Sequence, residues 1–143
     1  MNIFFDTSSF ISLYYEEKET EKLLHFLTAN PVYNIYLSEL TLVESYSAIY
    51  KKVRIKDLNL IEAEEFLTVL ENDLKSTSVI ILDSSIIAKS QKLIIEYGIK
   101  GLRALDAIQL ASLISIKDHI DFVFTGDKTL KEIFTEEGFN CEI

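Results

Sequence analysis

The 143-residue chain is 48% hydrophobic and contains only four glycines and one proline, which predicts a single helix-rich globular domain and excludes a disordered or fibrous protein. Its lone cysteine, Cys141, excludes an internal disulfide, and no apolar run reaches the roughly 18 to 20 residues that cross a membrane, so we expect a cytoplasmic protein without a membrane partner. The 14 basic and 23 acidic residues give a net charge of −9, which on its own argues against nucleic-acid binding.

Short β-rich runs alternate with longer helical patterns along the chain. We expect strands at 2–5, 34–37, 79–82 and 121–125, with 140–143 as a candidate fifth strand. We expect helices at 8–16, 19–29, 38–54, 59–76, 84–97, 103–117 and 128–137, of which 38–54 and 59–76 form an αα-hairpin. This alternation predicts βαβ units and an α/β fold around a mostly parallel sheet of four to five strands.

Several residues mark the predicted helix ends. Ser38 is a candidate N-cap, and Asn59 with Glu62 three residues later resembles a capping box. Gly98 and Gly138 lie where a left-handed residue would end a helix.

Two aspartates follow predicted strands directly. Asp6 comes after the strand at 2–5, and Asp127 follows the strand at 121–125 through Gly126. Ligands of open parallel sheets bind outside the carboxyl ends of the strands, which makes both residues candidate site residues. Each could instead be the N-cap of the next helix, and for Asp6 both roles can hold at once.

Two further acids interrupt apolar helical faces. Glu44 lies on a stripe that we expect to face the core, formed with Leu40, Val43, Ser47 and Ala48. Asp106 is the only charged residue between Arg103 and Lys117, so its helix is expected to be buried. The alternatives are that Glu44 lies at the edge of its stripe and reaches water or a lysine, and that Asp106 forms a salt bridge with Arg103.

Buried carboxylates are unfavourable unless a partner neutralises them. Four converging acids with few cationic partners nearby suggest a divalent cation, and carboxylate-held metal suggests phosphoryl chemistry. The hydroxyls of Thr7, Ser8 and Thr125 are candidates to orient these carboxylates or a water on the metal.

The four acids lie in four short segments, FDTS at 5–8, LTLVE at 40–44, GLRALDAIQLA at 101–111 and TGDKTL at 125–130. Their order and local sequence resemble the PIN-domain family of metal-dependent ribonucleases, and most closely the VapC-type toxins of prokaryotic toxin–antitoxin pairs. The match spans nearly the whole chain, and the third segment is its most specific part. Gln109 departs from the family pattern, in which a histidine is common at this position. The acidic pI near 4.7 is a second departure.

The resemblance implies a three-layer α/β/α PIN-like fold, with residues 1–143 as a single PIN-like domain and the acidic quartet at one end of the sheet. It also implies Mg²⁺ or Mn²⁺, endoribonuclease activity on RNA by metal-activated water, a cognate antitoxin and a homodimer. On this hypothesis Asp6, Asp106 and Asp127 hold the metal, and Glu44 ligates directly or through water. Lys100, Arg103 and Lys128 are the nearest candidates in sequence for binding substrate phosphates.

Two other functions remain open on sequence grounds. One is aspartyl-phosphate phosphotransfer with Asp6 as the nucleophile, although Ser8 stands where phosphatases of the haloacid-dehalogenase type have a second aspartate. The other is a catalytically degenerate PIN-like domain that binds a protein, in which the acids serve as caps and ion-pair partners.

Overall fold

The structure, a computed structural model, describes residues 1–16, 18 and 20–142. A five-stranded sheet has the order β3-β2-β1-β4-β5, and every neighbouring pair is parallel. The strands are β1 (Asn2–Phe5), β2 (Asn34–Ser38), β3 (Ser78–Ile80), β4 (Phe122–Phe124) and β5 (Cys141–Glu142). This confirms the predicted parallel sheet, and the last residue of the predicted strand 140–143 lies outside the described residues.

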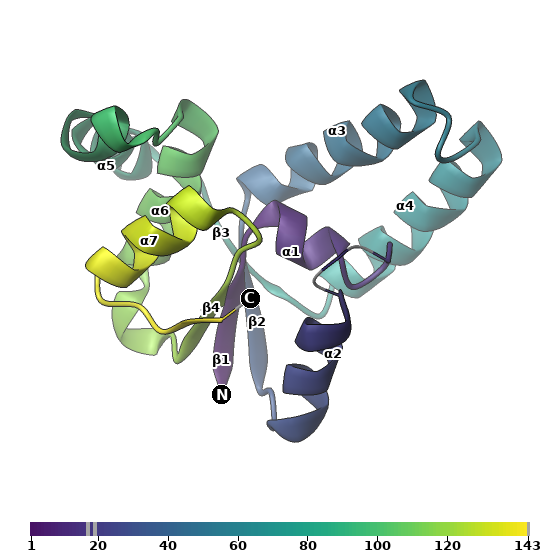
Figure 1. Cartoon of the computed structure of the whole chain (residues 1–143), viewed down its shortest axis with the longest axis horizontal. Helices are drawn as coiled ribbons and strands as arrows, with labels where there is room; N and C mark the ends of the chain where they lie inside the picture. The colour runs from purple at the N-terminus through teal and green to yellow at the C-terminus, as the bar shows by residue number, and fades with distance from the viewer. Residues whose placement is uncertain (17, 19, 143) are drawn as a thin grey trace.

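Helices cover both faces of the sheet, which confirms the three-layer α/β/α prediction. One face carries α1 (Thr7–Ile11), α2 (Thr20–Ala29), α3 (Leu40–Arg54) and α4 (Leu60–Leu74). The other carries α5 (Ser84–Tyr97), α6 (Ala104–Ser115) and α7 (Lys128–Glu136), with short 3-10 helices η1 (Gly98–Lys100) and η2 (Lys117–His119). In Figure 1 the sheet stands between these layers, and α3 and α4 form the predicted hairpin.

The two cores follow from the alternation of side chains along the central strands. Phe4 of β1 and Val123 of β4 pack in the core beneath α5, α6 and α7. Ile3, Phe5 and Phe124 point the other way, into the core with α1 to α4. The rings of Phe5 and Phe124 stack with their centroids 5.2 Å apart. Apolar side chains therefore fix β1 and β4 from both faces, and this rigid pair of strands delivers Asp6 and Asp127 to the same sheet edge.

Helix ends agree with the sequence at some positions and differ at others. Asn59 caps α4, because its Oδ1 accepts from the Glu62 backbone N–H at 2.8 Å, and Gly138 is left-handed with φ of 85°. The prediction for Gly98 is wrong, since it has φ of −60° and the chain continues into η1 before Gly101 turns left-handed with φ of 103°. Ser38 is not the N-cap residue, because it is the last residue of β2.

The first predicted helix is too long, because α1 ends at Ile11 and not at residue 16. Beyond Ile11 the chain forms turns, in which the Leu13 N–H donates to the Phe10 carbonyl at 3.2 Å, and the Thr20 hydroxyl donates to the Ser12 carbonyl at 3.0 Å. The predicted start of the second helix at Glu19 lies outside the described residues. No helix within the described residues is both long and apolar enough to cross a membrane.

Candidate active site

A cleft of about 580 Å³ lies at the carboxyl edge of β1 and β4, and all four predicted acids line it. Asp6 follows β1, Glu44 lies on α3, Asp106 lies in the first turn of α6, and Asp127 precedes α7. The fold therefore brings together carboxylates from four separate parts of the chain, as parallel strands sharing one edge predict.

Asp6 is the most deeply buried of these acids, with only 5% of its surface exposed. Its Oδ1 accepts from the Ser9 backbone N–H at 2.8 Å, which caps α1, and from the Ser8 hydroxyl at 3.0 Å. Its Oδ2 accepts from the Thr125 hydroxyl at 2.5 Å. Burial raises the pKa of Asp6 above its ordinary value, although these hydrogen bonds act in the opposite direction. Desolvation therefore disfavours the ionised carboxylate by more than its hydrogen bonds favour it. We call the charge of Asp6 under-compensated, because the protein's own groups offset only part of the cost of burying it.

Glu44 is held by uncharged donors. Its Oε1 accepts from the Thr7 hydroxyl and from Gln109 Nε2, both at 2.7 Å. Gln109 is buried, and its Nε2 also lies 3.1 Å and 3.2 Å from the hydroxyl oxygens of Thr7 and Thr41. The Glu44 carboxylate fixes the orientation of this amide, because the opposite orientation would place the amide oxygen against Oε1. Gln109 Oε1 is consequently buried without a hydrogen-bond partner among the described residues.

The other two acids also have structural partners. Asp127 caps α7 through the Leu130 backbone N–H at 2.8 Å, and its own N–H donates to the Thr125 hydroxyl. Asp106 accepts from Arg103 Nε at 3.2 Å, which is the salt bridge that the sequence offered as an alternative. The Arg103 side chain is 78% exposed, so this pair is weak and open to exchange. Capping and ion pairing therefore coexist with a place in the cleft.

The prediction that the Glu44 stripe of α3 faces the core is only partly right. Leu40 is buried and Ala48 packs against the core, but Val43 is 64% exposed and the whole stripe also lines the cleft. The stripe continues past Ala48 to Lys51, Lys52 and Arg54, which line the same cleft and which sequence reasoning missed. The signal was present, because Lys51 follows Glu44 by seven residues and so returns to the same helical face.

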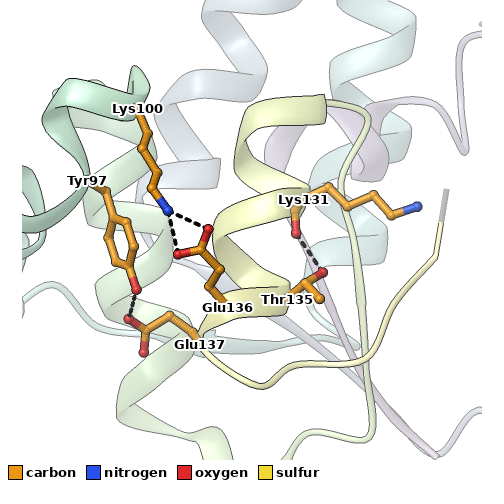
Figure 2. Close-up of polar contacts among 6 residues, drawn as sticks. All are labelled: Tyr97, Lys100, Lys131, Thr135, Glu136 and Glu137. Atoms are coloured by element: carbon orange, nitrogen blue, oxygen red, sulfur yellow. Dashed lines mark hydrogen bonds and ion pairs between the residues drawn. The ribbon is translucent and has the colours of Figure 1, made fainter.

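Of the three predicted phosphate-binding residues, only Arg103 is among those lining the cleft. Lys100 Nζ instead contacts both carboxylate oxygens of Glu136 on α7, at 2.5 and 2.7 Å, beside the hydrogen bond from the Tyr97 hydroxyl to Glu137 (Figure 2). Lys128 is exposed in the first turn of α7. Lys100 therefore tethers η1 to α7 in this conformation.

The carboxylates suit a hard divalent cation by their chemistry. In the described part of the chain, no lysine or arginine pairs with Asp6, Glu44 or Asp127, and no three Asp, Glu, His or Cys side chains are grouped closely enough to hold one ion together. Mg²⁺ commonly binds through only one or two carboxylates and keeps several waters, so a closed cage of protein ligands is not required. The under-compensated charge of Asp6 makes it the first candidate ligand.

Comparison with known proteins gives one family and a consistent set of folds. The family model described as "PIN domain" matches residues 3–134, whereas no curated protein matches the chain. The crystal structure of VapC20 from Mycobacterium tuberculosis, a Sarcin-Ricin loop cleaving toxin, is 17% identical with a TM-score of 0.67, covering 96% of this chain and 95% of that one.

Two further solved structures have the same fold at similar coverage. FitAcB from Neisseria gonorrhoeae is 16% identical with a TM-score of 0.70, covering 99% of this chain and 96% of that one. VapBC2 from Rickettsia felis, bound to a DNA fragment from its promoter, is 16% identical with a TM-score of 0.65, covering 99% and 98% of the two chains. At these identities the structures support the fold, and the family model covers most of the sequence. The chain therefore belongs to the PIN domain family.

Proposed function

We propose that this protein is a divalent-metal-dependent endoribonuclease and the toxin of a toxin–antitoxin pair. The observation that carries the proposal is the convergence of four carboxylates in one cleft, with the most buried of them left under-compensated by the protein. Membership of the PIN domain family and the likeness to VapC20, a Sarcin-Ricin loop cleaving toxin, support the choice of RNA as substrate. The proposal includes residues 1–143 as one domain, a cognate antitoxin, a homodimer and a cytoplasmic location.

In this proposal Asp6, Asp106 and Asp127 hold Mg²⁺ or Mn²⁺, and Glu44 ligates directly or through a water. The bound cation supplies an activated water and neutralises charge on the scissile phosphate. Thr125 and Ser8 orient the Asp6 carboxylate by donating to its two oxygens. Because the pKa of Asp6 is raised, protons compete with the cation for this carboxylate.

Around Glu44, Gln109 and Thr7 occupy one carboxylate oxygen, so the other oxygen remains the candidate ligand atom. Because the ion pair between Arg103 and Asp106 is weak, it can open. Asp106 is then free to bind the cation, and Arg103 is free to bind a substrate phosphate. No side-chain nucleophile is needed in this scheme, because water is the nucleophile. The protein's own contribution is to hold the oxygen ligands in place.

The test is RNA cleavage by purified protein freed of any partner, with end mapping in Mg²⁺, in Mn²⁺ and in chelator. We expect internal cuts that require the cation, and loss of cleavage in Asp6→Asn and in Asp106→Asn with unchanged circular dichroism. The double variant Lys89→Gln/Lys92→Gln, on the exposed side of α5, is the matched control and should cut normally. Full activity in either aspartate variant would refute the assignment.

A second candidate is a protein-binding PIN-like domain without catalysis. Three of the four acids have a structural role that favours this candidate: Asp6 and Asp127 are N-caps, and Asp106 pairs with Arg103. Burial of Asp6 argues against it, because an exposed serine or asparagine would cap α1 equally well without a desolvated charge. Metal-independent melting curves together with no cleavage of any RNA would favour this candidate.

A further inference from the structure

The cleft continues from the carboxylates along one face of α3. Glu44, Ser47, Ala48 and Lys51 all line it, at the spacing that returns to one side of a helix. With a rise of about 1.5 Å per residue, Lys51 lies about 10 Å and Arg54 about 15 Å from Glu44 along the helix axis. The acidic and basic parts of the cleft are therefore two ends of one continuous surface.

Two cations at the basic end of the cleft form no ion pair within the described residues. Lys51 and Arg54 are exposed, and neither has an ion-pair partner within the described residues. Lys52 differs, because its Nζ lies 3.6 Å from the centre of the Tyr15 ring. The first two side chains thus reach solvent at the cleft with their charges available, in a chain whose net charge is −9.

The helix dipole offers a structural explanation, since cations near a helix C-terminus are stabilising. The helix dipole does not explain why, among the described α-helices, basic residues occupy the last turn of α3 alone. None of the other α-helices in the described part of the chain has a basic residue in its last turn. The basic residues of α3 also lie on the helix that carries Glu44 and lines the cleft, which points to a ligand with negative charge.

Resting on the proposed function, we propose that Lys51 and Arg54 bind phosphates of the RNA strand next to the one that is cut. Single-stranded RNA lies along α3, with its scissile phosphate at the carboxylates and its flanking phosphates at these two cations. Local positive charge at one end of the cleft then explains how an acidic protein holds RNA. The remaining acidic surface repels strands that approach elsewhere, which restricts binding to the cleft.

The test measures the salt dependence of RNA binding by fluorescence anisotropy, with a short end-labelled single-stranded RNA of mixed sequence. All proteins carry Asp6→Asn so that the RNA stays intact. The test variant adds Lys51→Gln/Arg54→Gln, and the control adds Lys89→Gln/Lys92→Gln, which makes the same change in net charge on α5 away from the cleft. Each phosphate contact on a single strand contributes a slope of about 0.7 in log K against log salt, so the test variant should have a slope shallower by about 1.4.

The control should keep the parental slope, and Lys51→Arg/Arg54→Lys should restore it. An unchanged slope in the test variant, or an equal loss in the control, would overturn the inference even if the parent enzyme cleaves RNA. A lower melting temperature with an unchanged slope would also overturn it and would favour the helix-dipole explanation. Absence of cleavage by the wild-type protein, which keeps Asp6, together with the expected slope change, would overturn the nuclease proposal and leave an RNA-binding cleft.

Discussion

Replacing Asp6 by asparagine separates a metal ligand from a helix cap. Asparagine is as good an N-cap as aspartate, and its Oδ1 keeps the acceptor role toward the Ser9 N–H and the Ser8 hydroxyl. What changes is the buried charge and the partner of Thr125, whose oxygen must now accept from the new amide. If α1 needed only a cap, Asp6→Asn would have almost no effect on stability.

The direction of the change follows from the raised pKa of Asp6. Burial disfavours the ionised carboxylate by more than its hydrogen bonds favour it, so the charge costs stability that a neutral amide of the same size does not. We therefore expect Asp6→Asn to raise the free energy of unfolding and the Tm in chelator.

The assay is thermal unfolding of both proteins in chelator and in Mn²⁺. A cation at a concentration 100-fold above its Kd stabilises the folded state by about 2.7 kcal/mol, and the variant lacks a ligand for it. The order of stability should therefore reverse, with the variant more stable in chelator and the wild type more stable in Mn²⁺. A variant that is less stable in chelator, or equal metal stabilisation of both proteins, would refute the reasoning.

Three other outcomes test the same geometry. Gln109→Leu should lower metal-dependent cleavage about 10- to 100-fold, because it removes a donor that positions Glu44. Gln109→His keeps a donor at this position and should keep more of the activity. Separate measurements of kcat and KM check both variants. The stability advantage of Asp6→Asn in chelator should disappear as pH falls through the folded pKa of Asp6. Because that pKa is raised, the wild-type protein has its full stability at low pH and loses part of it as pH rises. Urea melts of both proteins across acidic pH measure the difference. Glu136→Gln should cost less than about 1 kcal/mol of stability and leave cleavage unchanged, because the Lys100–Glu136 pair is half-exposed and outside the cleft; a marked loss of activity would contradict its placement.

The sequence predicted the sheet and the acidic edge because both depend on local patterns. Short apolar runs ending in Asp6 and Asp127 identify parallel strands, and parallel strands place their carboxyl ends together. The bounds of β1 and α5 agree with prediction to the residue. The first helix was predicted too long because its apolar pattern continues through Tyr15, whereas α1 ends at Ile11 and turns follow.

Features that depend on packing between distant helices could not be predicted from sequence patterns. Glu44 and Gln109 are 65 residues apart, and their contact depends on how α3 and α6 approach one another. The direction of the α3 stripe was predicted only in part for a similar reason, since a stripe with Leu40, Val43 and Ala48 can face the core or form an apolar wall of a cleft. Only the arrangement of neighbouring helices distinguishes the two.

Binding of Mn²⁺, followed by the loss of the free-ion signal in electron paramagnetic resonance, tests most directly whether the carboxylates of this cleft hold a divalent cation. Wild-type protein should bind the ion saturably, and Asp6→Asn should bind it at least about tenfold more weakly while Lys89→Gln/Lys92→Gln binds it normally. Equal Mn²⁺ affinity in wild-type protein and Asp6→Asn would show that this buried aspartate is a helix cap and not a metal ligand.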